Sequence, residues 1–361
     1  MSKEKLSKNK KIHFCTSLAV NGVPKLGALI TSIAENITQD YLIWVLCEDD
    51  ATEVAVANLQ FRTVKVVPLS VFETVDPGIL VVKDQRDAFE YNCTVRPAWM
   101  LFILNSDPQV EFLTYVDNDL FFFNDPSTLC EEFAEASVLI SPHRLSTLAK
   151  MTGIDVNVVG QFNAGWIAVK NDDEARKVLN WWREKCIEWC YRIPIAGKFG
   201  EQKYLDEFQS VSKKVGIVQH LGVNVAPWNM NDFNVFSRPD GKVMVENTSL
   251  IFFHFHALKI PGESAFKVDK ELGEKTFQLT NPNYIIPKNI MENIYKPYLK
   301  VLSKFLMVGT PNHLEIAPSF WRLNNIHYFK KIKRLFISFK ARILYYLILF
   351  YKAYRKIYPH T

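Results

Sequence analysis

The sequence lacks the features of several common protein classes. Its six cysteines, at positions 15, 47, 93, 130, 186 and 190, include no CxxC pair, so they give no sign of a disulfide framework. The five lysines within residues 1–11 are not followed by an apolar segment of the length that a signal peptide needs. Neither an internal repeat nor a low-complexity linker interrupts the chain. We therefore expect a globular protein of the reducing cytoplasm.

Acidic residues are missing from the last part of the chain. After Glu315 there are ten Lys or Arg residues and no Asp or Glu, although the net charge of the whole chain is only +5. Residues 1–315 therefore carry 33 basic and 38 acidic side chains. Binding to a nucleic acid backbone needs a positive surface on the folded domain. The acidic balance of the body argues against nucleic acid as the main partner.

The composition and the apolar pattern predict an α/β fold. A chain of 361 residues with 48% hydrophobic residues can bury a large core. Strand-like runs at 11–20, 41–50 and 63–70 accompany a segment at 24–36 whose apolar residues recur at helical spacing. This order predicts a mostly parallel, doubly wound sheet.

The middle of the chain continues the pattern. Residues 95–104 predict a helix with Pro97 near its first turn, and residues 110–117 predict a strand that is apolar on both faces. Residues 163–172 predict a further strand. Residues 172–193 predict a helix with acidic residues in its first turn.

The stretch "TYVDNDLFFF" places Asp117 and Asp119 at the end of an apolar strand. Ligands of open α/β sheets gather at the carboxyl ends of strands. On an extended segment, residues i and i+2 point to the same side, so the two carboxylates would converge on one point. A divalent cation such as Mg²⁺ or Mn²⁺ would relieve their repulsion. The alternative is that Asp117 or Asn118 only caps the turn that follows.

Five segments in order resemble glycosyltransferases. The stretch "YVDNDLFFFNDPSTL" resembles the metal-binding D-x-D segment of GT-A fold glycosyltransferases. Two more segments, "QFNAGWIAVK" and "GKFGEQKYLDEF", resemble blocks of glycosyltransferase family 8. Finally, "NVAPWNM" and "FFHFHALK" are similar to blocks of related bacterial nucleotide-diphospho-sugar transferases. The resemblance covers roughly residues 11 to 262.

The resemblance implies a metal-dependent enzyme of GT-A fold, with a Rossmann-like, mostly parallel sheet and flanking helices. Residues 1–270 would form the catalytic domain and 271–320 a C-terminal extension. The enzyme would move a hexose from a UDP-sugar to a glycan or glycolipid acceptor at a membrane. Synthesis of bacterial cell-surface polysaccharide or lipopolysaccharide is the expected setting.

The resemblance also implies a metal site. Asp117, Asp119 and His254 occupy the places of the residues that hold Mn²⁺, or Mg²⁺, against the diphosphate of the donor. His256 competes for the place of the third ligand, because residues i and i+2 of a strand point the same way. We favour His254.

Several residues are expected to bind the donor nucleotide. Lys259 matches a phosphate-binding lysine of the family, although Ala257 replaces the glycine that usually lies between it and the histidine. Arg96 matches a basic residue that reaches the donor, the alternative being a surface residue or a structural ion pair. Substrate-binding places are also assigned to Asn118 in the D-x-D segment and, for the base and ribose, to Thr16 and Asn21, where the aromatic residue usual after the asparagine is a glycine.

Sugar recognition is expected from the second half of the domain. Asn163 offers an amide, and the small residues Ala164 and Gly165 would leave room for a hexose ring. Glu201 and Gln202 are the candidate catalytic residues near the anomeric carbon. Whether Glu201 is a nucleophile, a base or a hydroxyl ligand stays open, and only family 8 implies a retaining outcome. The list of expected substrate-binding residues ends with Trp228, at the acceptor mouth.

The basic tail, residues 321–361, predicts an amphipathic helix. In a helix over 329–358, eight apolar residues fall within an arc of roughly 80°, and all nine Lys and Arg residues lie outside it. The longest charge-free run, Ile343 to Tyr351, would span only about 13 Å, far less than a bilayer core of ~30 Å. We expect the helix to lie on the anionic inner face of the cell membrane. The alternative is a helix docked on the catalytic body or on a partner.

Two other functions fit parts of the pattern. A sugar-phosphate nucleotidyltransferase also binds nucleotides with paired carboxylates on a parallel sheet. It would show a Gly-rich, basic phosphate loop near the first strand, and "TSLAVNGVPKLG" is a poor version of one. A membrane-bound scaffold that keeps the GT-A fold without turnover is the non-catalytic alternative.

Overall fold

The computed structural model describes residues 11–133, 135–259, 278–279 and 284–306. The tail predicted at 321–361 therefore lies outside the described residues, and so does half of the expected extension at 271–320. Within the described ranges, no helix is long and apolar enough to cross a membrane.

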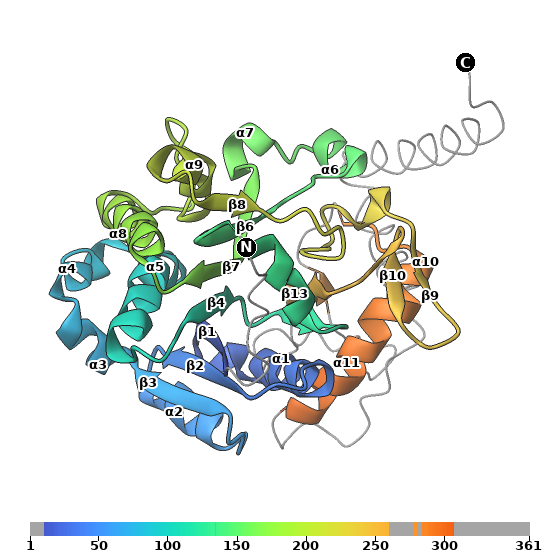
Figure 1. The fold of residues 1–361 in the computed structure, drawn as a ribbon, viewed down its shortest axis with the longest axis horizontal. Helices are drawn as coiled ribbons and strands as arrows, with labels where there is room; N and C mark the ends of the chain where they lie inside the picture. The colour runs from blue at the N-terminus through green and yellow to red at the C-terminus, as the bar shows by residue number, and fades with distance from the viewer. Residues whose placement is uncertain (1–10, 134, 260–277, 280–283, 307–361) are drawn as a thin grey trace, which may run out of the picture.

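A mostly parallel sheet forms the centre of the described structure (Figure 1). Its seven strands lie in the order β3-β2-β1-β4-β7-β6-β8 among the residues described. β1, β2, β3 and β4 are parallel, whereas β7 is antiparallel to both β4 and β6. The strands predicted from apolar runs are all present, because strands covered on both faces need continuous hydrophobic sequence. The bounds are β1 (Ile12–Leu18), β2 (Tyr41–Cys47), β3 (Val64–Pro68), β4 (Phe112–Val116), β6 (Val138–Pro142), β7 (Phe162–Lys170) and β8 (Val215–Ile217).

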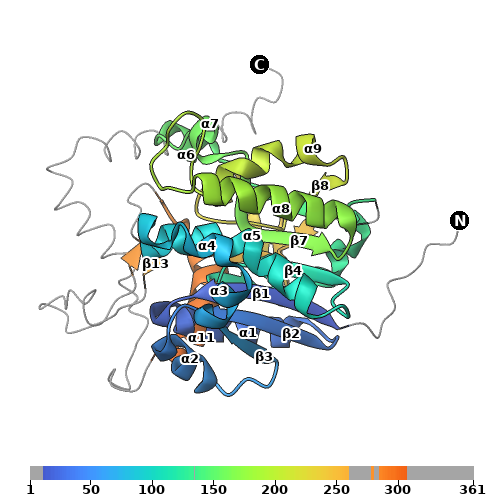
Figure 2. The same ribbon diagram turned by 90° about the vertical axis from the view of Figure 1, so that its left-hand side faces the viewer.

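Helices cover both faces of this sheet (Figure 2). On one face α5 (Ala88–Ser106) packs beside α8 (Asp173–Glu188), and their buried tryptophans, Trp99 and Trp182, belong to one hydrophobic cluster. On the other face lies α1 (Val23–Asn36), the helix predicted from its apolar spacing. Shorter helices complete these layers: α2 (Asp50–Ala57), α3 (Leu69–Val75), α4 (Pro77–Leu80), α6 (Thr147–Met151), α7 (Val156–Val159) and α9 (Phe208–Val211).

The helix predicted at 95–104 is longer than expected, and the position given to Pro97 was wrong. α5 begins at Ala88, where Asp87 and Glu90 form a capping box, and Pro97 lies inside the helix. A proline inside a helix removes one backbone hydrogen bond and costs about 3 kcal/mol. The burial of 12 of the 19 residues of the helix, among them Pro97 itself, outweighs that cost. The D-x-x-E signal of a capping box was present in the sequence.

A two-stranded ribbon joins the sheet to the C-terminal part of the described chain. β5 (Leu120–Phe122) follows the D-x-D segment and pairs antiparallel with β12 (Phe252–His254). Residues 284–306 pack beside this ribbon and against α1, where a Cβ on Gly27 would lie 2.5 Å from the ring of Phe305. The remaining elements are β9 (Val235–Ser237), β10 (Val243–Val245), β11 (Thr248–Ser249), β13 (Leu258–Lys259), β14 (Gln278–Leu279), α10 (Lys288–Ile290) and α11 (Lys296–Leu302).

Candidate active site

A cavity of about 720 Å³ opens beside the carboxyl ends of β1 and β4. This volume is within the range of small-molecule sites. Residues from distant parts of the chain line it, and most of the residues singled out from the sequence are among them. The predicted residues that line the cavity are Asn21, Arg96, Asp117, Asn118, Asp119, Asn163, Gly165, Glu201, Gln202, Trp228 and His254.

Two carboxylates and an imidazole meet at one point of the cavity. One ligand atom from each of Asp117, Asp119 and His254 lies within 4.8 Å of the others. The aspartates converge through a tight turn, in which the N–H of Leu120 donates to the carbonyl of Asp117 at 3.2 Å. The expectation that an extended segment aims both carboxylates was therefore wrong in its geometry. The ribbon supplies the histidine, because His254 of β12 pairs with Leu120 of β5.

An imidazole and an ammonium lie beside Asp119. Nε2 of His254 lies 3.1 Å from Oδ1 of Asp119, and Nζ of Lys25 lies 3.7 Å from Oδ2 of the same carboxylate. Burial acts to raise the pKa of Asp119, but His254 and Lys25 together outweigh it and hold that pKa below its usual range. Asp119 is therefore a carboxylate at any physiological pH.

Gly165 keeps space open beside Asp117 and His254. Its carbonyl accepts the backbone N–H of Asp117 at 2.8 Å, which brings β7 directly against the turn. A Cβ at this position would lie 2.6 Å from Cε1 of His254 and 2.7 Å from Oδ2 of Asp117. The position admits only glycine without a shift of the neighbouring side chains. Two carboxylates and one imidazole around such a gap fit a divalent cation of the Mn²⁺ or Mg²⁺ type.

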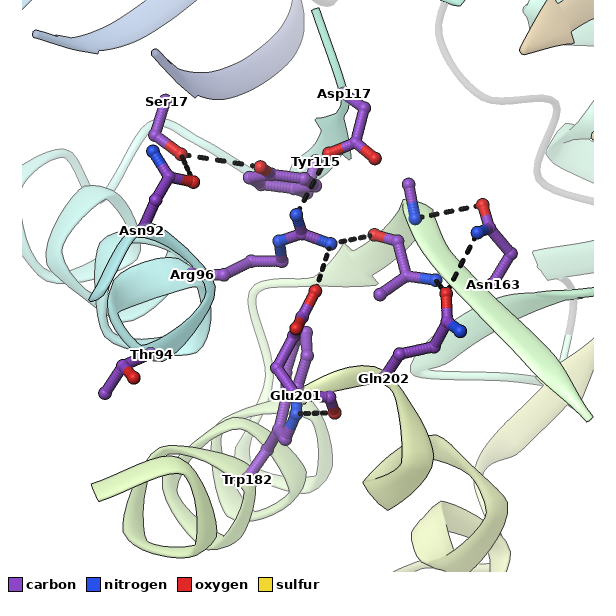
Figure 3. A network of polar contacts seen from close by, with 12 residues as sticks. Ser17, Asn92, Thr94, Arg96, Tyr115, Asp117, Asn163, Trp182, Glu201 and Gln202 are labelled. Atoms are coloured by element: carbon purple, nitrogen blue, oxygen red, sulfur yellow. Dashed lines mark hydrogen bonds and ion pairs between the residues drawn. The ribbon is translucent and has the colours of Figure 1, made fainter. Parts of the chain in front are cut away.

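Arg96 joins the acidic pair to the candidate catalytic residues (Figure 3). Its side chain is 7% exposed, and Nη2 lies 3.0 Å from Oδ1 of Asp117. Nη1 lies 2.9 Å from Oε1 of Glu201 and donates to the carbonyl of Ala164 at 2.9 Å. The guanidinium also lies over the ring of Tyr115, 4.4 Å from its centre. Arg96 is thus a buried ion-pair partner inside the site and not a surface residue.

The side-chain amides of Asn163 and Gln202 form hydrogen bonds to each other and to the backbone of β7. Oε1 of Gln202 accepts from Nδ2 of Asn163 at 3.0 Å and from the N–H of Ala164 at 3.2 Å, and Nε2 donates to the carbonyl of Val159. Oδ1 of Asn163 accepts the N–H of Gly165 at 3.1 Å. Gln202 therefore ties its loop to β7. Ala164 does not line the cavity, and the expectation that its small side chain leaves room for a sugar is corrected by this backbone role.

Thr16 does not reach the cavity. Its side chain is fully buried, whereas the next residue, Ser17, lines the cavity. Because neighbouring residues of a strand point to opposite faces, only one of the two can face the site. Ser17 donates to Oδ1 of Asn92 at 3.0 Å, and its hydroxyl lies 3.4 Å from that of Tyr115. These three polar residues were missed, although the alternation along the first strand was a usable signal.

Trp228 packs against His254, one of the three residues that form the candidate metal site (Asp117, Asp119 and His254, called the metal candidate below). Its indole Nε1 donates to the carbonyl of His143 at 3.0 Å, and its ring lies 5.1 Å from that of His254 and 5.4 Å from that of His256. His256 lines the cavity outside the group of three ligand atoms. His143 was not singled out from the sequence. Its Nδ1 contacts the carbonyl of Gly160, and burial lowers the pKa of His143 to about 4.

The segment after His254 turns sharply. Ala257 has a φ of 63°, in the left-handed region that favours glycine. The family glycine noted at this place therefore answers a backbone requirement that this chain meets with alanine. Lys259 follows on β13, and its side chain lies outside the described part of the structure.

Comparisons with known proteins agree with this architecture. No family model matches the sequence. The chain is 36% identical over 251 residues to the uncharacterized protein YfnF of Bacillus subtilis (strain 168). This match covers 68% of this chain and 82% of YfnF. It is 30% identical over 296 residues to YfnD of the same organism, covering 81% of this chain and 89% of YfnD.

A solved structure gives the fold. The chain superposes on an active-site mutant of LgtC, a galactosyltransferase, with a TM-score of 0.50 and 12% sequence identity. The match covers 83% of this chain and 98% of LgtC. This likeness shows that the chain has the GT-A fold expected from its sequence.

Proposed function

The chain belongs to the same family as YfnF and YfnD of Bacillus subtilis, and we propose that it is a metal-dependent glycosyltransferase. It transfers a hexose from a nucleoside diphosphate sugar, and a UDP-hexose is the first candidate donor. The observation that carries this proposal is the group of two carboxylates and an imidazole whose ligand atoms lie within 4.8 Å of one another, inside a cavity at the carboxyl ends of a parallel sheet. Gly165 keeps space open beside one of these carboxylates and the imidazole.

Asp117, Asp119 and His254 are the residues that would hold the cation, with Mn²⁺ as the first candidate and Mg²⁺ as the second. When bound, it would supply positive charge for the leaving nucleoside diphosphate.

Arg96 and Glu201 act on the sugar side of the site in this proposal. Glu201 is 7% exposed and its carboxylate is oriented by Arg96, so it presents a fixed acceptor for hydroxyls of the donor sugar. Arg96 holds the carboxylates of Asp117 and Glu201 in place by pairing with both. The hydrogen bond between Asn163 and Gln202 holds β7 beside the segment that carries Glu201 and Gln202.

The acceptor is a glycan or glycolipid at a membrane. This part of the proposal rests on the basic amphipathic pattern of residues 321–361, which would place residues 1–270 as a catalytic domain on the inner face of the cell membrane. Lys259 is retained as a phosphate ligand, together with Asn21 and Asn118 on the nucleotide side. The pathway proposed is bacterial cell-surface polysaccharide or lipopolysaccharide synthesis.

Turnover of nucleotide sugars tests the proposal. Purified protein is incubated with Mn²⁺ and a panel of UDP-, GDP- and dTDP-hexoses, and release of the nucleoside diphosphate is measured. We expect a UDP-hexose to be consumed, and D117N and D119N to lose at least ~100-fold in rate while their melting curves stay cooperative. No turnover of any sugar nucleotide, with pyrophosphate release from CTP or UTP and a sugar phosphate instead, would make the protein a nucleotidyltransferase.

A further inference from the structure

Lys25 is a cation beside the metal candidate that the sequence did not single out. It stands in the first turn of α1, and its Nζ lies 3.7 Å from Oδ2 of Asp119. Both side chains are 16% exposed. At this distance the ammonium is an ion-pair partner without a direct hydrogen bond, and no described residue accepts a hydrogen bond from it. Within the described residues, the three N–H donors of Lys25 therefore make no hydrogen bond to protein and stay available close to the site.

The position of α1 relative to the D-x-D turn is fixed by side chains. Ser32 accepts the backbone N–H of Phe122 at 3.0 Å, and Asn36 donates to the carbonyl of the same residue at 3.2 Å. At the other end of the helix, a Cβ on Gly22 would lie 3.0 Å from Nδ2 of Asn118. The helix is thus held to the strand that follows the turn and approaches the turn itself closely. The lysine is carried by a rigid element and not by a loop.

The two oxygens of Asp119 have different partners. Oδ1 lies 3.1 Å from Nε2 of His254 and Oδ2 lies 3.7 Å from Nζ of Lys25, so the imidazole and the ammonium share one carboxylate. A divalent cation held by Asp119 would withdraw negative charge from this carboxylate and weaken its attraction for the ammonium. The ammonium would then be available to a nearby anion.

Lys25 is not one of the described residues that line the cavity, but it pairs with the lining residue Asp119, and the Lys or Arg residues among the described lining residues are Arg96 and Arg192. Arg96 is already engaged by Asp117, Glu201 and the carbonyl of Ala164. Arg192 lies at an exposed place with its guanidinium over the ring of Phe89, 4.7 Å from the ring centre. Among the described side chains, this leaves Lys25 as the cation nearest to Asp119 whose charge is not taken up by several partners.

We propose that Lys25 is a diphosphate ligand that rests on Asp119 until a divalent cation and the nucleotide arrive. The inference rests on the proposed function, since it takes the diphosphate of a nucleotide sugar as the anion. A lysine is suited to this because its ammonium is a compact point charge with three donors on a flexible stem.

Binding measurements on the full chain separate this role from a purely structural one. Wild type, Lys25→Met and, as a matched control on an exposed helix surface, Lys177→Met are titrated calorimetrically with MnCl₂ alone. They are then titrated with UDP, inorganic pyrophosphate and uridine in saturating Mn²⁺. Circular dichroism and melting curves verify that each variant is folded.

The expected result is selective. Lys25→Met binds UDP and pyrophosphate about 10- to 100-fold more weakly, the loss typical of a charge-assisted hydrogen bond. Its affinities for Mn²⁺ alone and for uridine stay within about threefold of wild type, because neither ligand needs the ammonium. Lys177→Met matches wild type throughout.

Two results for Lys25→Met would overturn the inference. Unchanged affinity of Lys25→Met for pyrophosphate would exclude contact with a diphosphate. An equal loss for Mn²⁺ alone would show that Lys25 only organises Asp119. Wild type that binds pyrophosphate but not UDP would refute the uridine donor of the proposed function, while the pyrophosphate comparison still decides the role of Lys25. Wild type that binds neither would refute both.

Discussion

The metal candidate and the Arg96 network share Asp117 but differ in how their charges are balanced. In the network, one buried guanidinium contacts two carboxylates and a backbone carbonyl, so every charge has a close partner (Figure 3). In the metal candidate, two carboxylates lie near an imidazole and an ammonium, beside a glycine whose Cβ would crowd the imidazole and one carboxylate. The carboxylates of the Arg96 network are paired with a guanidinium without any ligand. The metal candidate gains the positive charge that balances its carboxylates only when a cation binds.

The difference separates what stabilises the fold from what binds. A buried charge that loses its only partner costs several kcal/mol, whereas carboxylates gathered for a metal repel each other until it binds. Changes in the network should therefore lower stability, and changes in the metal candidate should lower ligand affinity with little loss of stability.

Filling the gap should have the largest effect. Gly165→Ala places a methyl group 2.6 Å from the ring of His254 and 2.7 Å from the carboxylate of Asp117, so the ligand atoms must move apart. We expect Mn²⁺ affinity to fall by about 100-fold or more, as for the loss of a ligand position. Calorimetric titration with MnCl₂ measures it. An Ala variant that binds Mn²⁺ as wild type does would show that the gap is not the cation site.

Removing the buried guanidinium should have the next largest effect. Arg96→Met leaves Asp117 and Glu201 without their partner, and we expect a loss of about 3 kcal/mol in the free energy of unfolding. Urea denaturation measures it. Arg238→Met, which breaks a surface pair with Asp240, should cost less than about 1 kcal/mol. Equal costs for the two variants would mean that the network does not stabilise the fold.

Acidification should act through His143, next to Trp228. Burial lowers its folded pKa to about 4, below the unfolded value near 6.5, so the unfolded state binds the proton first. Its contribution to stability is present above about pH 6.5 and is lost as the pH falls toward 4, by roughly 3 kcal/mol in total. Urea denaturation of wild type and His143→Gln between pH 7 and pH 4 should show a flatter dependence in the variant. Parallel curves would contradict the prediction.

The turn after the metal candidate should give the smallest effect. Ala257 has a φ of 63°, which costs an alanine about 1 kcal/mol relative to glycine. Ala257→Gly should raise the free energy of unfolding by up to about 1 kcal/mol, less the gain of chain entropy in the unfolded state. Thermal melting of the two proteins compares them. A lower melting temperature would mean that the alanine side chain makes contacts that exceed its strain.

The sequence predicted the parts of the site that depend on local patterns. The apolar strand that ends at Asp117 and Asp119 is visible in one short stretch, and both residues lie where it placed them. His254 came only from the family resemblance, because nothing in its spacing shows that β12 pairs with β5. The mostly parallel character of the sheet and the positions of β1, β2, β3, β4 and β7 followed from apolar runs and helical spacing, whereas the order of the strands did not.

The rest depended on contacts between distant residues. Arg96 and Glu201 are 105 positions apart, and their pairing follows from the packing of α5 against the sheet, which no local pattern shows. The same holds for Lys25 and Asp119. Thr16 is buried while its neighbour Ser17 lines the cavity, because residues alternate between the two faces of β1. Pro97 lies inside α5 and not at its start, because the capping box of Asp87 and Glu90 begins the helix ten residues earlier.

Anomalous diffraction at the manganese edge, from crystals grown with MnCl₂ and UDP, tests the central claim most directly. The account predicts one strong peak in the gap beside Gly165, within bonding distance of Asp117, Asp119 and His254, with the diphosphate on its open side. A cavity that contains UDP without such a peak, or a peak held by other residues, would contradict it.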